Sequence, residues 1–368
     1  MGILHAKFSF MEEWITYKLG DVLTIKYGKD HKSLSDGPVP AFGSGGIMRY
    51  VEKPIFDKPS ILIPRKGSLN NVVYIDEPFW TVDTMFWTII DTSIVIPHFL
   101  YYTIRDIDFA SLNVGSAVPS LTCPVIESIE VSIPSLITQR KILDCLEPID
   151  EKIALNTRIN HNLEEQARIH FEAWCAECKE NKPLRELSAN ILDYTPNKCK
   201  KVILLNSSDV TEGHFESLPY VENSNLKGQF KKRFMKGDIL YSEIRPRNHH
   251  YAICYFDAEE YIASTRLMVI RRNRKMISSD ALLYQYLLMP SVLEEFTSKT
   301  ESRSGTFPQG NYEDLSSSEV PYREDNSQIS KTLEAIYGII WSNLEENYCL
   351  ASLRDSLLPQ LMTGQITC

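Results

Sequence analysis

The side chains best suited to metal chemistry are few and poorly grouped. His249 and His250 adjoin in RPRNHHYA, but no third ligand follows at a metal-binding spacing. Cys175 and Cys178 form a CxxC, and neither a second CxxC nor an HxxxH lies nearby. We therefore expect reduced thiols and no metal, with a zinc site at the CxxC or histidine ligation left as the less favoured alternatives.

A catalytic constellation is equally hard to find. Asp83 in TVDT is a candidate carboxylate, but Ser264 takes its place in the second half of an internal repeat. The sequence contains no phosphate-binding GxxxxGK[ST], no HExxH and no GxSxG. It also lacks an NPPY-like tetrapeptide, which an amino-methylating enzyme would carry. We therefore expect no catalytic residues in this chain.

Residues that could contact nucleic acid are more numerous and lie in both halves. Arginine can pair with guanine, and lysine can neutralise phosphates. A solvated basic face is the alternative for the charged stretches, and GSGG could be a plain hairpin turn instead of a loop that approaches a partner. The candidate DNA-binding residues are Ser44, Gly45, Gly46, Arg65, Lys66, Ser68 and Asn70 in the first half, and Lys231, Lys232, Arg233, Arg245, Arg247, Asn248 and His249 in the second.

Charge is distributed unevenly along the 368 residues. The formal net charge of −9 alone argues against a polyanionic partner. Residues 181–280, however, hold 17 Lys and Arg against 12 Asp and Glu, and local charge matters more for binding a polyanion. No apolar run approaches the ~18 residues of a membrane span. The N-terminus has no signal-peptide core, so we expect a cytoplasmic protein without a membrane partner.

The chain repeats itself weakly in two halves. Both halves share an alternating apolar pattern, a strand-to-loop segment with polar residues, and a short apolar strand that ends in proline. Three blocks align: WTVDTMFWTI (80–89) with YIASTRLMVI (261–270), ILIPRKGS (61–68) with ILYSEIRP (239–246), and VPS (118–120) with FPQ (307–309).

Each half closes with a long amphipathic helix. Spacings of three and four indicate a heptad seam, so we expect the helices to pack together, with an antiparallel arrangement favoured. An asparagine pair recurs on this seam, and we hypothesise that it fixes register, because a buried amide tolerates only a partner that satisfies it. Pro148 should kink the first helix or mark its start. The helix-pairing positions are Ile149, Ile153, Asn156, Asn160 and Leu163 in the first helix and Ile336, Ile340, Asn343, Asn347 and Leu350 in the second.

These features predict an α+β protein with a pseudo-two-fold repeat. Two mixed α/β domains would be separated by two long helices packed as an antiparallel coiled coil. The expected parts are a first mixed domain (1–137), a central helix (138–180), a second mixed domain (181–325), and a C-terminal helix with its tail (326–368).

Five blocks of the sequence resemble the specificity subunit of Type I restriction–modification systems. Block 61–84 and the tail are the most specific of them, whereas residues 181–325 follow the family pattern loosely. The blocks are WITYKLGDVLTIKYGK (14–29), PAFGSGGIMRY (40–50), ILIPRKGSLNNVVYIDEPFWTVDT (61–84), TQRKILDCLEPIDEKIALNTRINHNLEEQARIHFEAW (138–174) and LRDSLLPQLMTGQI (353–366).

The resemblance implies a non-catalytic subunit that reads a split site in double-stranded DNA. The mixed domains 1–137 and 181–325 would be two target recognition domains, each reading one half-site. The helices would set the spacer and dock two methyltransferase subunits, through which restriction subunits join. S-adenosylmethionine, ATP and magnesium would belong to those partners, with no cofactor in this chain. The family's circular organisation implies that the N-terminal EEWITYKLGDV meets the C-terminal tail.

Two other classes of function remain open. A stand-alone DNA-processing enzyme such as a nuclease would need a carboxylate or histidine cluster shared by both halves, and the repeat shows none. A structural coiled-coil scaffold would show no sequence preference and would leave the basic loops unexplained.

Overall fold

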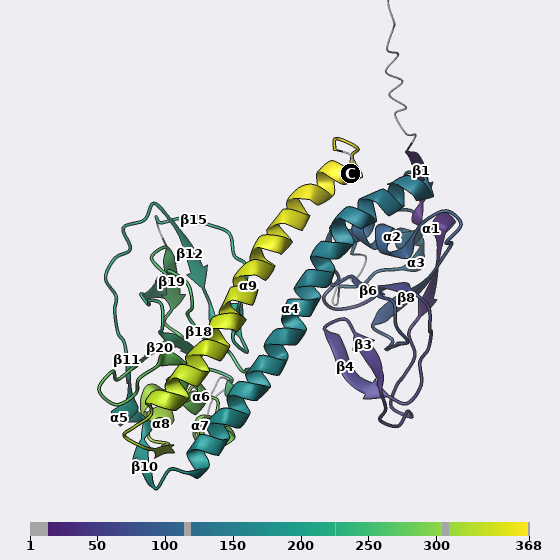
Figure 1. The fold of residues 1–368 in the computed structure, drawn as a ribbon. Helices are drawn as coiled ribbons and strands as arrows, with labels where there is room; N and C mark the ends of the chain where they lie inside the picture. The colour runs from purple at the N-terminus through teal and green to yellow at the C-terminus, as the bar shows by residue number, and fades with distance from the viewer. Residues whose placement is uncertain (1–13, 114–118, 225, 304–308, 367–368) are drawn as a thin grey trace, which may run out of the picture. The chain divides into compact units, whose positions relative to one another are not determined.

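The computed structural model describes residues 14–113, 119–224, 226–303 and 309–366 (Figure 1). The chain forms two compact units. The first comprises residues up to Ile153 together with those from Cys349 onward, and the second runs from Ala154 to Tyr348. Among the described residues, no helix is both long and apolar enough to cross a membrane.

The first unit is built on a four-stranded antiparallel sheet with a smaller three-stranded sheet. The larger sheet has the order β2 (Leu23–Tyr27), β8 (Met85–Ile90), β5 (Ser60–Pro64), β6 (Val73–Ile75). The smaller has the order β4 (Gly46–Val51), β3 (Val39–Gly43), β7 (Trp80–Thr81), and β3 pairs with β7 in parallel. The remaining elements are β1 (Ile15–Lys18), α1 (Leu19–Val22), α2 (Pro97–Ile104), η1 (Phe109–Leu112), α3 (Cys123–Glu127) and β9 (Glu130–Ile133).

The second unit uses the same plan with longer insertions. One four-stranded sheet has the order β11 (Ser188–Asn190), β20 (Leu267–Arg272), β17 (Ile239–Ser242), β18 (Tyr251–Ile253). Another has the order β15 (Val221–Glu222), β12 (Lys201–Leu205), β19 (Tyr261–Ser264), β16 (Phe230–Lys232). The other elements are β10 (Glu180–Pro183), α5 (Leu184–Leu187), η2 (Ser207–Asp209), β13 (Val210–Thr211), β14 (His214–Phe215), η3 (Pro246–Asn248), α6 (Asp280–Leu287), α7 (Pro290–Glu301), α8 (Tyr312–Ser316) and β21 (Glu319–Tyr322).

The internal repeat is confirmed at the level of strand pairing. Each unit has an antiparallel four-stranded sheet in which the first strand along the chain pairs with the last, β2 with β8 and β11 with β20. The parallel pairs β3–β7 and β12–β19 also correspond. A short pair also closes each half, β1 with β9 and β10 with β21. Even an isolated backbone bridge recurs, because Lys66 pairs with Ser120 and Ile244 pairs with Gln309. These residues stand opposite each other in the sequence alignment of the two halves.

The core of the first unit contains both ends of the described chain. Trp14 packs at the edge of a buried cluster that includes Leu143 and Leu146 from one long helix and Leu358 and Leu361 from the other. Apolar burial of this kind stabilises by about 25 cal/mol per Å² removed from water. The meeting of the N-terminal segment with the tail, expected from the family resemblance, is therefore confirmed from Trp14 onward.

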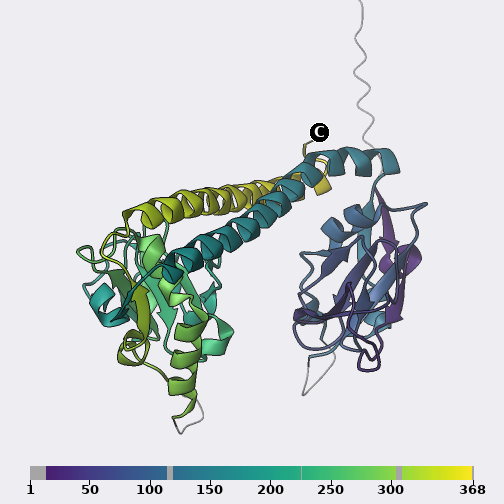
Figure 2. The ribbon, with the colours of Figure 1, turned by 60° about the horizontal axis from the view of Figure 1, so that its bottom comes forward.

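The two long helices are α4 (Leu136–Ala176) and α9 (Ser327–Met362), and they pack antiparallel (Figures 1 and 2). Within the second unit, Ala167 and Phe171 of α4 share a buried cluster with Leu333 and Ile340 of α9. In the first unit, Arg354 Nη1 of α9 lies 2.7 Å from Asp150 Oδ1 of α4. The predicted antiparallel pairing of the helices is confirmed.

Four details of the helix prediction change. The first helix begins at Leu136, two residues earlier than expected. Pro148 lies in its interior and does not mark its start. The second helix continues to Met362. His170 continues the spacings of four and three from Leu163 through Ala167, but it is exposed, and Phe171 is buried in its place. A helix has 3.6 residues per turn, so a strict heptad seam drifts around it and the buried face moves by one residue near its end.

The asparagines of the seam pair across the two helices, with Asn156 and Asn160 buried and Asn343 and Asn347 half-buried. Asn343 Nδ2 donates to Asn160 Oδ1 at 2.7 Å, and Asn156 Nδ2 donates to Asn347 Oδ1 at 2.9 Å. Asn156 also donates to Glu346 Oε2, and Asn160 donates to the Ile340 carbonyl. The apolar members Ile336 and Ile340 are buried, whereas Ile149, Ile153, Leu163 and Leu350 are half-buried.

Candidate nucleic-acid interface

In the first unit, the structure brings two candidate loops into contact. Ser44 and Gly45 form the tight turn of the β3–β4 hairpin, and Gly46 opens β4 with φ of +112°. GSGG is therefore a hairpin turn, and its approach to a partner stays a prediction. The loop after β5 reaches this turn, because Asn71 Nδ2 donates to the Ser44 carbonyl at 2.9 Å. A Cβ on Gly67 would lie 2.9 Å from Ser44 Oγ, so glycine there permits the close approach.

The basic residues of this loop are held in defined positions. Arg65 lies over the Tyr27 ring at 5.3 Å, and its Nη1 donates to the Asp83 carbonyl at 3.1 Å. Tyr27 is 55% exposed, so the stacked pair stands on the surface and not in the core. Lys66 follows immediately and is fixed by its backbone bridge to Ser120. A cation stacked on an exposed aromatic ring is pre-ordered for contact with a base edge or a phosphate.

The two polar candidates of the same loop differ. Ser68 is exposed. Asn70 uses its amide within the protein: its Nδ2 donates to Asp108 Oδ1 at 3.1 Å, and its Oδ1 accepts from the Ala110 backbone N–H at 2.9 Å. Asn70 therefore orders the η1 segment, and its amide is already hydrogen-bonded in this structure.

The corresponding loop of the second unit begins after β17. Arg245 is exposed and has φ of +49°, a left-handed conformation that is uncommon for a residue with a side chain. Arg247 forms two parallel hydrogen bonds with Glu301, at 2.6 and 2.8 Å, although its side chain is 72% exposed. Asn248 is exposed, and His249 Nδ1 lies 2.9 Å from Glu212 Oε1. The four candidates therefore lie together, and Arg247 and His249 have acidic partners.

The Lys231–Arg233 cluster divides between surface and interior. Lys231 is exposed, with its Nζ 5.6 Å from the centre of the Tyr194 ring. Lys232 is 3% exposed, donates to the Leu267 carbonyl at 2.7 Å and lies 3.5 Å from the Glu243 carboxylate. Burial lowers the pKa of Lys232, and Glu243 opposes that shift. Arg233 is half-buried and donates to the Glu259 carbonyl. Lys232 was predicted to contact DNA, but its side chain is buried, and that prediction is wrong.

The alternation of strand residues could have identified Lys232 as an interior residue. β16 runs from Phe230 to Lys232, and neighbours two apart in a strand share a face. Phe230 is buried, so Lys232 faces inward with it. A further basic stretch, RRNRK, is also partly internal, because Arg271 holds Asp238 through two hydrogen bonds at 2.6 and 2.7 Å.

Exposed apolar side chains on β4 were missed by the sequence reasoning. Ile47, Met48 and Tyr50 are each more than half exposed. They follow the hairpin turn that contacts the Arg65 loop, so they extend the same edge of the first unit. Alternation alone does not identify them, because two consecutive apolar residues occupy both faces of the strand.

Cys175 of the CxxC lies in the last turn of α4, and Cys178 follows the helix. Burial raises the pKa of Cys175 to about 12, and it also raises that of Cys178. Among the described residues, no group of three His, Cys, Asp or Glu side chains is placed to hold a metal ion.

Comparisons with known proteins bear on the family. Residues 11–165 match the family model described as Type I restriction modification DNA specificity domain. A curated relative, the Type I restriction enzyme HindI specificity subunit of Haemophilus influenzae, is 34% identical over 179 residues. That match covers 47% of this chain and 38% of the relative, so well under half of the relative's length is matched.

The fold also resembles that of a solved structure. The S subunit of a Type-I restriction-modification system from M. genitalium has a TM-score of 0.56 with this chain at 15% sequence identity. The alignment covers 96% of this chain and 97% of that one, and at this identity the likeness concerns the fold. Residues 11–165 are thus similar to the DNA specificity domain of Type I restriction–modification systems, and the fold of the chain resembles that of one solved S subunit.

Proposed function

We propose that this chain is the DNA sequence-specificity subunit of a Type I restriction–modification complex and reads a two-part site in double-stranded DNA. The observation that carries the proposal is the duplicated loop. In both units a strand of the four-stranded sheet ends in a loop fixed by the same bridge, Lys66–Ser120 or Ile244–Gln309. Arginine adjoins each bridge, at Arg65 and Arg245. Two equivalent loops suit two half-sites.

The chain itself would be non-catalytic. Two methyltransferase subunits would dock on the helices, and restriction subunits would join through them. S-adenosylmethionine, ATP and magnesium would serve chemistry in those partners. The similarity of residues 11–165 to the Type I DNA specificity domain and the two-unit fold support a non-catalytic role for this chain.

A gel shift of the chain reconstituted with its methyltransferase subunit tests the proposal. Arg245→Ala and Lys66→Ala should each weaken specific binding by about 1–3 kcal/mol if a base contact is lost. Lys331→Ala, an exposed lysine on α9, is the matched control. Unchanged affinity in both loop variants at moderate salt would contradict the site assignment. Divalent-metal-dependent cutting by the purified chain alone would favour a nuclease instead.

A further inference from the structure

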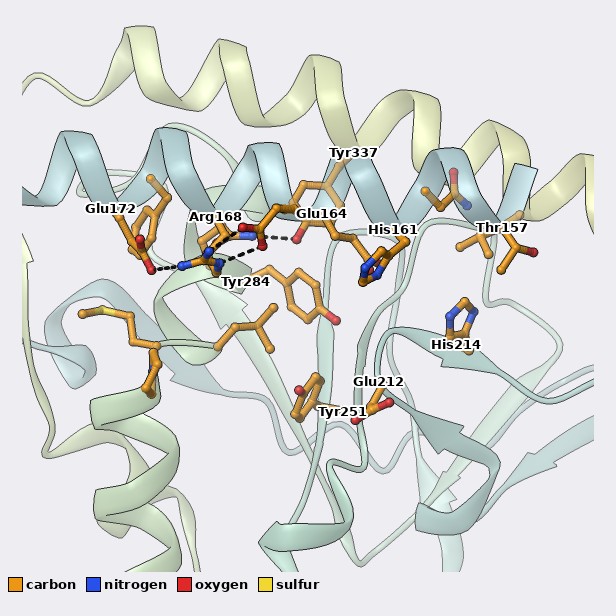
Figure 3. Close-up of a pocket in the computed structure, with 18 of the residues that line it drawn as sticks. Thr157, His161, Glu164, Arg168, Glu172, Glu212, His214, Tyr251, Tyr284 and Tyr337 are labelled. Carbon is orange, nitrogen blue, oxygen red and sulfur yellow. Dashed lines mark hydrogen bonds and ion pairs between the residues drawn. The ribbon is translucent and has the colours of Figure 1, made fainter. Parts of the chain in front are cut away.

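A hollow of about 880 Å³ opens beside the C-terminal half of α4, entirely within the second unit (Figure 3). His161, Glu164 and Arg168 of α4 line one side, and Glu212, Tyr251 and Tyr284 line the other. The loops assigned to DNA contribute none of their arginines to it. Its acidic groups would repel phosphates, so the hollow calls for a different ligand.

The floor of the hollow holds a hydroxyl that has no hydrogen-bond partner among the described residues. Tyr284 is 4% exposed, and its hydroxyl forms no hydrogen bond with any described residue. Figure 3 shows this hydroxyl pointing into the open space between His161 and Glu212. This hydroxyl sits on a largely buried ring and opens on the cavity, so it is available to a hydrogen-bond donor of a group bound there.

Aromatic faces surround that hydroxyl. Tyr284 makes edge contacts with Tyr251 at 6.4 Å and with Tyr337 at 5.6 Å between ring centres. The Tyr337 hydroxyl is already occupied, because Gln285 Nε2 donates to it at 2.7 Å. Leu288 and Met289 add apolar surface to the same lining. The floor thus offers π-faces and an aliphatic wall, and among the described residues the hydroxyls of Tyr251 and Tyr284 make no hydrogen bond.

Two carboxylates stand over this floor. Arg168 is occupied by its neighbours on α4, with Nε 3.0 Å from Glu165 Oε2 and Nη1 2.6 Å from Glu172 Oε1. Glu164 has no ion pair with any described residue. The surrounding protein raises the pKa of Glu164 by burial, even though the side chain opens on the hollow, and His161 and His214 oppose the shift.

The second carboxylate is held in place by an unusual backbone. Glu212 has φ of +46°, and its partner His249 has φ of +53°. Both values lie in the left-handed region, which costs residues with a side chain about 1 kcal/mol or more. The 2.9 Å contact between Glu212 Oε1 and His249 Nδ1 keeps this carboxylate at the rim of the hollow.

We propose that this hollow receives an arginine side chain from a protein partner. A guanidinium stacks on tyrosine, donates to carboxylates through a planar fork and can donate to the Tyr284 hydroxyl oxygen. The aliphatic stem of arginine suits the Leu288 and Met289 wall. The choice of partner, the methyltransferase subunit, rests on the proposed function.

The pocket can be tested without that partner by methyl NMR of the full chain. Met289 lines the hollow, and its labelled methyl resonance can be assigned by its loss in Met289→Leu. The probe is agmatine, which carries a guanidinium at one end of a four-carbon stem and an ammonium at the other. We expect a saturable shift with agmatine, at least tenfold weaker binding of 1,4-diaminobutane, which has an ammonium in place of the guanidinium, and no saturable shift with uncharged n-butylurea.

Variants then assign the contacts. Glu164→Gln should weaken agmatine binding at least tenfold, and Tyr284→Phe should weaken it about threefold. Glu334→Gln, an exposed acid on α9 outside the hollow, is the matched control and should leave affinity unchanged. The pocket assignment is overturned if the Met289 resonance does not move, if n-butylurea or inorganic phosphate moves it as agmatine does, or if Glu164→Gln binds agmatine normally.

The partner is tested by assembly with the methyltransferase subunit. Glu164→Arg should weaken that complex at least tenfold, whereas Glu334→Arg should not. Normal assembly of Glu164→Arg would overturn the choice of partner. If the unaltered chain does not bind the methyltransferase subunit at all, the proposed function fails, and the agmatine titration still decides the pocket.

Discussion

Asn160 of α4 and Asn343 of α9 form a direct amide–amide hydrogen bond, 2.7 Å long, inside the helix pair of the second unit. The two residues occupy different positions in their helices, because Asn343 corresponds in the repeat to Asn156. The antiparallel packing therefore crosses the pairs: Asn160 meets Asn343, and Asn156 meets Asn347. Each pair joins the first position of one repeat with the second position of the other.

This pairing predicts a strong coupling between the two amides. Asn160→Leu alone leaves the Asn343 amide without its partner, and we expect a loss of about 1–3 kcal/mol in the free energy of unfolding. Asn160→Leu with Asn343→Leu should cost less than the sum of the single changes, because both polar groups then leave the seam. Denaturant unfolding of the four proteins measures the difference, and strictly additive losses would count against the coupling.

The role of the amides in register is a separate hypothesis. The combination Asn156→Leu with Asn343→Leu removes one member from each pair, so it tests register more severely than loss of a single pair. Such a protein should fold but misalign its helices or self-associate. Light scattering and the recognised DNA spacer report this, and a monodisperse protein with an unchanged spacer would show that the amides serve another purpose.

Neighbouring lysines in β16 should behave differently on substitution. Lys231→Ala should leave stability unchanged and, if Lys231 contacts a phosphate, should reduce the salt dependence of DNA binding by about one unit of slope. Lys232→Ala removes a buried cation from Glu243, so unfolding should become easier by about 3 kcal/mol. Binding isotherms at several salt concentrations and urea unfolding separate the two effects. Equal stability losses would contradict the burial of Lys232.

Alkaline pH should destabilise the protein through its buried tyrosines. Burial raises the pKa of Tyr74, Tyr251 and Tyr255 to about 12 each. The unfolded chain ionises near pH 10, so the folded state holds its protons more tightly. The stabilisation is therefore complete below about pH 10 and is lost as pH rises toward 12. In a pH titration, the tyrosinate absorbance of the folded protein should rise at higher pH than that of the denatured chain. Two titration curves that coincide would contradict the burial of these tyrosines.

Helix length should set the distance between half-sites. One heptad inserted after Ile153 of α4 and one after Cys349 of α9 would keep both asparagine pairs intact. Seven residues add about 10 Å of helix, which equals about three base pairs of DNA. The recognised spacer should lengthen accordingly, as measured by binding to a series of spacer-variant duplexes. An unchanged spacer would show that helix length does not set the distance between the half-sites.

The strongest sequence signals concerned repetition and period. Alignment of the halves placed Lys66 against Ile244 and Ser120 against Gln309, and the same two bridges form in the structure. The helix seams were predictable because a heptad pattern constrains many positions at once. The crossing of the asparagine pairs follows from the antiparallel direction, which the sequence favoured but did not require.

The candidate contacts were less predictable because their partners are distant in sequence. Arg247 pairs with Glu301, and Asn70 orders residues near Asp108, and no local pattern links either pair. Lys232 was the exception, since strand alternation with Phe230 points it inward. Whether a surface arginine is available to DNA therefore depends on tertiary pairing that composition and period do not encode.

Methylome sequencing tests the central claim most directly. A host lacking other methylation systems would express the chain with its methyltransferase subunit, and single-molecule sequencing would map the modified bases. The modified bases should fall in one motif of two parts, separated by a fixed spacer, and this motif should disappear when the chain is omitted. A contiguous motif, or methylation that is the same without the chain, would contradict it.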